Sequence, residues 1–232
     1  MKDLSQAGAD AEITASPLAT FASSWCRDGE RVVSVRIDPA TRDDLYVEHL
    51  RTGAGERLPV NTAGNDYQGV LSPDDRWLAY VTDASGRDEV WVASFPSGRV
   101  RKQVSTRGGV SPQWTSGGKE IAYISEGRWL TVRSFTGTDT TVTLGSPRPL
   151  FPAGTFVETT GLLTPSANSY VSAAGPRRFL AAVRMNDPRV PPIQLIVDWR
   201  ALLPENDGPR ESASMSPCDP RKQFRPTRWR PS

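Results

Sequence analysis

The stretch Leu71–Val81, LSPDDRWLAYV, decides the fold class. Its first residue ends one short strand, and Ser-Pro-Asp-Asp then forms a tight turn in which Pro73 presets φ. The next residues, from Trp77 onward, are mostly aromatic or apolar and favour a second strand. One face of that strand carries Trp77, Ala79 and Val81, and the other carries Leu78, Tyr80 and Thr82. Both faces are largely apolar, so we expect the strand to lie between two neighbouring sheets.

The same cassette recurs along the chain. Copies are Trp25–Val35 (WCRDGERVVSV), Trp114–Ile124 (WTSGGKEIAYI) and, in degraded form, Val171–Leu180 (VSAAGPRRFL). From Trp25 to Leu71 is 46 residues, and from Leu71 to Trp114 is 43. A repeat of 40–50 residues is typical of propellers and related arrays.

Each repeat continues with two more expected strands. After the turn Asp83–Asp88 comes a third strand, Glu89–Ser94, whose equivalents are Asp44–Leu50 and Arg128–Arg133. A short fourth strand follows near Arg101–Ser105. Four antiparallel strands per repeat make a propeller blade. The sequence therefore predicts an all-β fold, a partial β-propeller with about three clear four-stranded blades and incomplete flanking blades.

The repeat also divides the chain. Residues 1–18 are expected to hold the last strand of a preceding, mostly missing blade and a linker, with Asp10–Thr14 as that strand. The expected blades are 19–62, 63–106 and 107–152, then a degenerate final blade with a closing strand at 153–203 and a disordered basic tail at 204–232. The tail is assigned from its Pro, Ser and Arg content without periodicity.

These residues resemble a known group. Leu71–Val81 followed by Gly86–Val92 is similar to the WD40-like (PD40) repeats of TolB-type propellers. The series Gln103–Thr106, Gly109–Trp114, Gly118–Tyr123 and Pro147–Phe151 resembles the C-terminal propeller of bacterial eukaryotic-like serine/threonine kinases. Ile196–Trp199 is similar to that family's last strand, with Asp198 where Asn is usual. Departures within the repeats include Cys26 for proline, and Asp75 and Gly117 in the Asp-Gly turn.

The kinase resemblance implies a cytoplasmic kinase domain, a membrane helix and an extracytoplasmic propeller. The chain itself has no Gly-rich phosphate loop, His-Arg-Asp loop or Asp-Phe-Gly motif, so kinase activity does not carry over. Similar propellers also occur in TolB and in prolyl-oligopeptidase relatives. On this resemblance the chain is extracytoplasmic or periplasmic if attached to a membrane-anchored parent. It is cytoplasmic if made alone, because Met1–Gln6 is polar and no signal peptide is recognisable.

The chemistry-bearing residues do not form a catalytic set. His49 is the only histidine, and it lies in an expected strand, where we expect a local hydrogen bond. No Gly-x-Ser-x-Gly motif occurs. Cys26 and Cys218 are far apart, which argues against a disulfide framework or a zinc site. We therefore expect no enzyme, no catalytic, cofactor-binding or metal-binding residues, and no cofactor.

Two residue types recur with the repeat. Aspartates stand at the turns, and we expect them to cap backbone amides, with calcium coordination as the alternative; they are Asp28, Asp74, Asp75, Asp83 and Asp88. Tryptophans also follow the period, and we expect them to pack between blades, with a ligand platform as the alternative; they are Trp25, Trp77, Trp91, Trp114 and Trp129.

Charge is unevenly distributed. The net charge is +2, but residues 221–232 carry five positive and no negative charges, which leaves −3 for the rest. A nearly neutral body argues against nucleic-acid binding. The tail, with Phe224 and Trp229 among its basic residues, keeps open a binder of anionic polymers or membrane surfaces. No run of 18 apolar residues is present, so we expect no membrane span in this chain.

The leading functional hypothesis is a non-catalytic ligand- or protein-interaction module, a sensor from a receptor-kinase-like protein. Its partner would be a protein, peptide or small ligand at the blade loops. The first alternative is a propeller accessory domain of a prolyl-oligopeptidase-like hydrolase, or a TolB-like periplasmic scaffold. Because an open arc of blades exposes edges and apolar faces, we also expect association with missing blades or a second copy.

Overall fold

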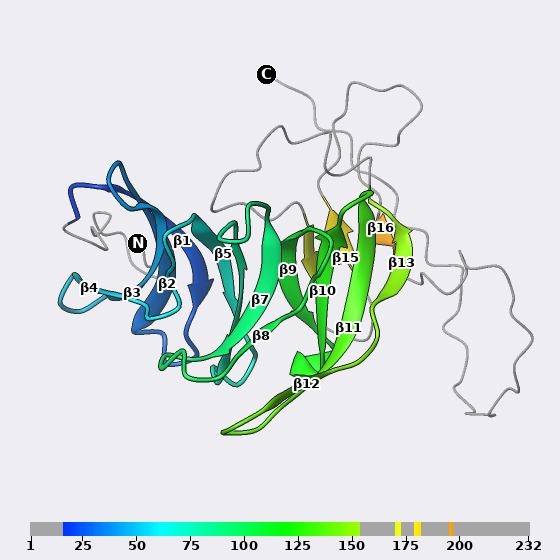
Figure 1. Cartoon of the computed structure of the whole chain (residues 1–232). Helices are drawn as coiled ribbons and strands as arrows, with labels where there is room; N and C mark the ends of the chain where they lie inside the picture. The colour runs from blue at the N-terminus through cyan, green and yellow to red at the C-terminus, as the bar shows by residue number, and fades with distance from the viewer. Residues whose placement is uncertain (1–15, 154–169, 173–178, 182–194, 197–232) are drawn as a thin grey trace, which may run out of the picture.

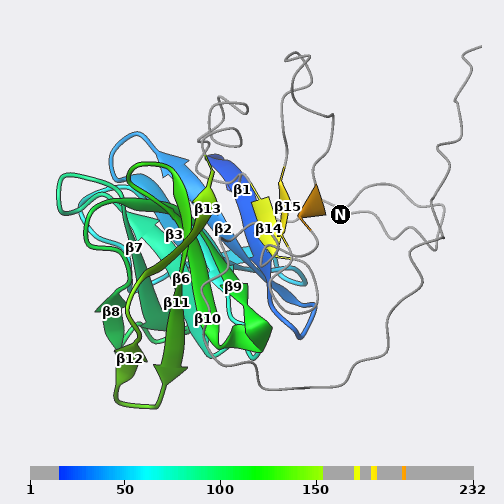
Figure 2. The ribbon, with the colours of Figure 1, turned by 90° about the vertical axis from the view of Figure 1, so that its right-hand side faces the viewer.

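A computed structural model describes residues 16–153, 170–172, 179–181 and 195–196. These residues form antiparallel strands and one 3₁₀ turn, Ser116–Gly118. The strands make four sheets. The first three succeed one another across Figure 1 in chain order, and β14 of the fourth contacts β9 of the third. Figure 2 looks along this succession, so the sheets overlap in that view. No strand pairing among the described residues joins the fourth sheet back to the first. The predicted fold class, a partial β-propeller of antiparallel blades, is confirmed.

In each of the first two sheets, strands that are consecutive in the sequence are also neighbours in the sheet. The first contains β1 (Ala19–Trp25), β2 (Arg31–Asp38), β3 (Arg42–His49) and β4 (Ala54–Arg57). The second contains β5 (Asp66–Leu71), β6 (Trp77–Thr82), β7 (Glu89–Ser94) and β8 (Arg101–Gln103). The quoted cassette is therefore β5, its turn and β6.

The third sheet departs from the four-stranded plan. It contains β9 (Gly109–Thr115), β10 (Glu120–Ser125), β11 (Trp129–Gly137), β12 (Val142–Leu144) and β13 (Arg148–Pro152). The long strand β11 pairs with β12 along its last residues and with β13 along its first residues. The hairpin β11–β12 projects from the lower end of the sheet in Figure 1. Edge strand β13 contains Pro149 and Pro152, which cannot donate to a further strand.

The fourth sheet is described only in part. It contains β14 (Tyr170–Ser172), β15 (Phe179–Ala181) and β16 (Leu195–Ile196) in antiparallel pairing. Several expectations lie outside the described residues: the strand Asp10–Thr14, the strand positions Val197–Trp199 and the tail 204–232.

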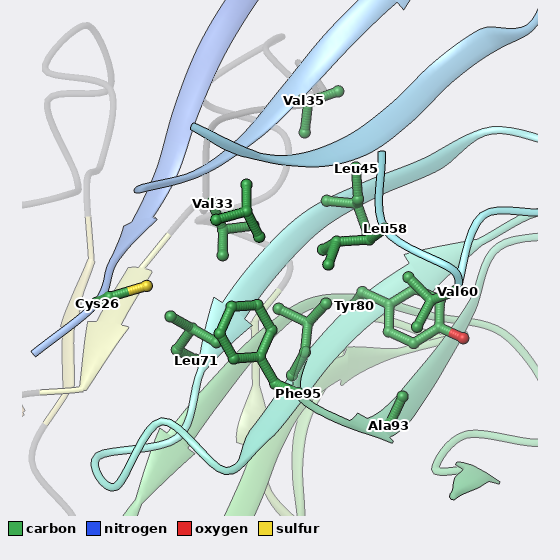
Figure 3. Close-up of a cluster of buried hydrophobic side chains, with 12 residues drawn as sticks. Cys26, Val33, Val35, Leu45, Leu58, Val60, Leu71, Tyr80, Ala93 and Phe95 are labelled. Carbon is green, nitrogen blue, oxygen red and sulfur yellow. The ribbon is translucent and has the colours of Figure 1, made fainter. Parts of the chain in front are cut away.

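Strand β6 is covered on both faces, as its sequence predicts. Leu78 and Tyr80 belong to a buried cluster with Val33, Leu45 and Leu58 of the first sheet and its following loop (Figure 3). Trp77, Ala79 and Val81 belong to a second cluster, which includes Ile121 and Phe135 of the third sheet. All six residues of β6 are buried. The second sheet is thus held by apolar contact from either side.

Strand β10 repeats this arrangement one sheet further along. Ile121 and Tyr123 face the second sheet, whereas Ala122 and Ile124 join a third cluster that contains Tyr170 and Phe179. The ring of Phe179 makes edge contacts with those of Tyr170 and Phe151. Each interface between sheets is therefore an apolar layer, and its burial stabilises the stack by about 25 cal/mol per Å² of apolar surface removed from water.

The first strands of neighbouring sheets are also joined by hydrogen bonds. Both β5 and β9 contain an irregularity at which a non-glycine residue has positive φ, Gln68 (52°) and Ser111 (55°). The side-chain Oε1 of Gln68 accepts the backbone N–H of Ser111 at 2.7 Å. The indole Nε1 of Trp114 donates to the carbonyl of Val70 at 2.9 Å. These bonds satisfy polar groups that the irregular pairing leaves free inside the protein.

The interface between the second and third sheets provides a stability test. Ile121 is fully buried there, so Ile121→Ala is expected to lower the free energy of unfolding by about 2–5 kcal/mol in urea denaturation. Ile37→Ala, at a half-buried position of β2, is the matched control and should cost clearly less. Equal losses in the two variants would contradict the stacking of these sheets.

Asp66, the first residue of β5, is a buried carboxyl. Its Oδ2 accepts the backbone N–H and the hydroxyl of Thr62, at 2.6 Å and 2.9 Å, while Oδ1 has no hydrogen-bond partner. Burial raises the pKa of Asp66 above the usual 3.8, and this effect exceeds that of the hydrogen bonds from Thr62 and Thr82. The ionised form is therefore disfavoured in the folded chain.

This carboxyl predicts a pH dependence of stability. The contribution of a group whose folded-state pKa is raised is present below 3.8 and is lost as pH rises through the folded-state pKa. Relative to wild type, Asp66→Asn should therefore gain stability as pH increases from about 4 in urea unfolding series. Asp28→Asn is the control of opposite sign, because the backbone N–H of Glu30 and the Arg31 side chain lower the pKa of exposed Asp28. A difference between Asp66→Asn and wild type that does not change with pH would refute this account.

Candidate functional site

A crevice of about 500 Å³ opens on the third sheet beside the loop that joins it to the second sheet, and we call it the Trp129 crevice. It lies at the end of the sheets where two loops meet, Thr106–Gly108 after β8 and the tight turn Ser125–Trp129 between β10 and β11. Its walls come from strands β10, β11 and β13 and from these loops. They are lined by Thr106, Arg107, Gly108, Tyr123, Ser125, Glu126, Gly127, Trp129, Thr131, Pro147 and Pro149. A hollow of this size can hold a small ligand or a few residues of a peptide.

One change between repeats explains why the space is open. In the second sheet, Tyr80 lies directly opposite Trp91, and that tryptophan packs against the apolar cluster facing the first sheet. In the third sheet the equivalent tyrosine, Tyr123, lies opposite Thr131. Directly opposed residues share one face of a sheet. Thr131 is far smaller than Trp91, so the corresponding space beside Tyr123 is left unfilled.

A second change places an aromatic ring at the rim. The third strand of the second sheet begins with buried Glu89, which accepts hydrogen bonds from the Ser105 hydroxyl and from the backbone N–H of Gly108 (3.0 Å). Trp129 begins the corresponding strand of the third sheet and is 42% exposed. Its ring is therefore available to solvent beside the crevice. An exposed tryptophan that lines a hollow is a common element of recognition sites.

The polar groups of the crevice are unevenly satisfied. The Thr131 hydroxyl lies 3.2 Å from that of Ser125, so these two groups are used within the sheet. Tyr123 is only 4% exposed, and among the described residues its hydroxyl has no hydrogen-bond partner. Burial raises the pKa of Tyr123, while the positive charges of Arg133 and Arg107 oppose that shift. Arg107 and Glu126 are exposed and form no ion pair within the described part of the chain.

A second hollow, of about 610 Å³, lies at the opposite end of the same two sheets, beside the β11–β12 hairpin. Its charged side chains are largely occupied within the protein. Asp74 accepts the Ser72 hydroxyl at 2.6 Å, and Arg76 pairs with Asp139 of the hairpin at 2.6 Å. Gly137 packs so closely on Trp77 that a Cβ there would lie 2.3 Å from the indole. This end is better explained as a contact that holds the hairpin.

The single histidine lies far from both hollows in the chain and lines neither of them. His49 ends β3, and its Nε2 is 3.4 Å from Oε1 of exposed Glu56, which follows on β4. Cys26 is a free, buried thiol whose pKa is raised to about 11, chiefly by burial. Cys218 lies outside the described residues. Neither His49 nor Cys26 lines the Trp129 crevice.

Four of the five turn aspartates cap backbone amides, as expected, whereas the Asp88 side chain interacts with the Tyr67 hydroxyl. Asp28 accepts the N–H of Glu30 at 2.9 Å, and Asp83 accepts the N–H of Asn65 at 2.7 Å. Asp74 accepts the N–H of Arg76, and Asp75 accepts the N–H of Arg27 across the first two sheets at 2.7 Å. Within the described ranges no group of three or more metal-ligating side chains is found. In the same ranges no helix is long and apolar enough to cross a membrane.

The expectation that the periodic tryptophans pack between blades is right for three of them and wrong for two. Trp77 and Trp114 are buried and Trp91 is partly buried, all within inter-sheet clusters. Trp25 and Trp129 are 49% and 42% exposed. Trp129 follows a tight turn whose residues Gly127 and Arg128 have positive φ. The residues Arg107, Tyr123 and Thr131 were not singled out from the sequence, although aligning Thr131 with Trp91 would have indicated a gap.

No protein-family model matches the sequence, and the comparison with curated proteins finds no match. The solved structures with a similar fold include the following two. TolB from Acinetobacter baumannii has a TM-score of 0.53 and 17% identity over 72% of this chain and 38% of its own. A puromycin-hydrolyzing peptidase from Mycobacterium tuberculosis has a TM-score of 0.53 and 21% identity over 78% of this chain and 30% of its own.

These likenesses concern the fold. They confirm the prediction of a TolB-like propeller, and the chain spans less than half of either matched protein. The Trp129 crevice lies at the end of the third sheet where the loops Thr106–Gly108 and Ser125–Trp129 meet. Among its lining side chains, Arg107, Glu126 and Trp129 are exposed to solvent.

The exposure of Trp129 predicts a small structural role. Trp129→Ala should lower the free energy of unfolding by less than about 1.5 kcal/mol, because little buried surface is lost. Trp77→Ala is the matched comparison, since Trp77 is 4% exposed and contacts the Phe135 ring, and it should cost about 3–5 kcal/mol. Urea denaturation of both variants gives the two values. A large loss for Trp129→Ala would show that its ring is a packing element.

Proposed function

We propose that this chain is a non-catalytic interaction module that binds a protein, peptide or small ligand in the Trp129 crevice. The observation that carries the proposal is the replacement of the Trp91 position by Thr131, which opens the crevice in one inter-sheet space and leaves Trp129 exposed at its rim. A binding site built by changing one repeat leaves the stacking of the others intact.

The residue types in the crevice support binding rather than covalent chemistry. Its lining contains no histidine or cysteine, and the hydroxyl of Ser125 interacts with Thr131 and with the carbonyl of Trp129. Nucleophilic catalysis needs a base within hydrogen-bond reach of the nucleophile. Aromatic, proline and a few polar side chains are the usual lining of a ligand pocket.

The leading context for such a module is a receptor-kinase-like protein. There the propeller would lie on the extracytoplasmic side and sense a ligand, while the kinase domain acts across the membrane. The support is the resemblance of Gln103–Tyr123 and Pro147–Phe151 to kinase-linked propellers. Sequencing the gene on both sides of this reading frame tests the context, and a kinase domain followed by a membrane helix is the expected finding.

A second candidate is a propeller that positions substrate for a hydrolase in the same polypeptide. The similarity in fold to the puromycin-hydrolyzing peptidase favours it. A peptidase domain encoded beside this frame would support this candidate over the receptor.

The exposed side chains of the first sheet favour a further contact with another sheet. Phe21 and Trp25 of β1 are 40% and 49% exposed. Large apolar side chains in solvent mark interaction surfaces. We propose that this sheet associates with further blades or with a second copy of the chain.

Filling the crevice tests the proposed function. Thr131→Trp should abolish ligand binding, because a tryptophan already occupies the equivalent position, Trp91, in the second sheet. Ligand-observed NMR screening of amino acids, short peptides and sugars against wild type and variant measures this. Thr138→Trp, on the exposed hairpin loop, is the control and should bind as wild type does. Retained binding of every hit by Thr131→Trp would contradict the proposal.

A further inference from the structure

The Trp129 crevice is lined by Tyr123, whose hydroxyl forms no hydrogen bond with the described residues. The Tyr123 hydroxyl reaches the crevice from a side chain that is 4% exposed, and the described residues offer it no hydrogen bond. The tyrosine hydroxyl can donate one hydrogen bond and accept others, and Tyr123 is among the residues that line the crevice. A ligand acceptor at this point would satisfy it.

Arg107 provides a positive charge beside this hydroxyl. It lines the crevice, forms no ion pair within the described ranges, and lies close enough to Tyr123 to oppose the rise in that residue's pKa. The planar guanidinium of arginine matches the two oxygens of a carboxylate. A hydroxyl donor and a free guanidinium together form a subsite for a carboxylate.

Glu126 provides the opposite charge at the entrance. Its Cβ lies close to Gly108, next to Arg107, and yet no ion pair joins Arg107 to Glu126. A carboxylate only accepts hydrogen bonds, so it suits an N–H group or an ammonium. One free cation and one free anion at the same hollow fit a ligand that carries both an acid and an adjacent N–H donor.

The remaining wall is apolar and cannot extend a strand. Pro147 and Pro149 lack backbone N–H groups, and Pro149 pairs with Thr131 on the edge strand β13. The Trp129 ring is exposed beside them. This wall therefore favours contact with an apolar side chain over main-chain pairing with a peptide.

We propose that the ligand of the crevice is an apolar α-amino-acid unit with a free carboxylate. This inference rests on the proposed function of the crevice. The carboxylate contacts Arg107 and the Tyr123 hydroxyl, and Glu126 accepts the neighbouring N–H. The apolar side chain lies against Trp129 and the two prolines. Such a unit is either the C-terminal residue of a peptide or a free amino acid.

In the spaces between the first three sheets, which the structure describes, we expect one such site. The space between the first and second sheets contains Trp91 where the crevice has Thr131, and the loop Thr62–Gly64 carries Ala63 where Thr106–Gly108 carries Arg107. Binding should therefore saturate at one ligand per chain.

Isothermal titration of the full chain tests the ligand class with defined probes. The probes are an acetylated tripeptide ending in phenylalanine, the same peptide as its C-terminal amide, and free phenylalanine. The free-acid peptide or the free amino acid should bind, and amidation should weaken the peptide's affinity about tenfold or more. If the peptide acid binds and phenylalanine does not, the ligand is a polypeptide C-terminus. If phenylalanine binds with the same affinity as the peptide acid, the ligand is a free amino acid.

Variants separate this inference from the proposed function. Arg107→Gln should weaken binding of the acid about tenfold and leave the amide unchanged, and Tyr123→Phe should weaken the acid as well. Arg99→Gln, an exposed arginine outside the crevice, is the control. Equal affinity for acid and amide, or binding by neither phenylalanine nor the peptide acid, overturns the carboxylate inference. In that case, other ligands found in the NMR screen would still test the crevice. If Thr131→Trp no longer binds them, the crevice remains the proposed binding site.

Discussion

The structure depends on covering both faces of the middle strands. Strand β6 has no polar face to turn toward water, and neither does β10, so each sheet is stable only between two neighbours. The tight turn between the first two strands of each repeat agrees with this constraint. Such a turn returns the chain into the same sheet, so both faces of the sheet stay free to pack on neighbouring sheets. The stack of sheets is therefore the unit of stability, and a single repeat is not.

The same constraint explains how a binding site can arise. An inter-sheet space closes only if the residues on its two walls fill it, and packing in protein interiors leaves few gaps. At the interface of the second and third sheets, Trp77, Ile121 and Phe135 fill one end, while Thr131 leaves the other end open beside Tyr123. The fold thus tolerates the crevice because the interface remains continuous elsewhere. The proposed binding site is therefore a local exception to the packing that the other repeats share.

Much of the fold could be predicted from the sequence because the repeat is strong where packing is strict. The cassette Leu71–Val81 fixed the position of β5, its turn and β6, and the two-faced burial of β6 followed from alternation alone. The positive φ of Gln68 and Ser111 could not be predicted, since neither is a glycine and the bond between them joins two sheets. The strand expected at Arg128–Arg133 is present as part of β11, but its extension and the hairpin with β12 could not be predicted, because Phe135–Leu144 has no counterpart in the other repeats. For the site, periodicity was misleading: Trp129 fits the spacing of the buried tryptophans, but the turn before it directs its ring to solvent.

Amide hydrogen exchange under native conditions tests the central claim most directly. If both faces of β6 are sealed by neighbouring sheets, the amides of Trp77–Thr82 should be among the slowest to exchange and should open only with global unfolding. The edge strand Ala54–Arg57, which is largely exposed, should exchange much faster. Exchange of the β6 amides at the rate of that edge strand would contradict the account, because it would mean that the sheets are not packed face to face.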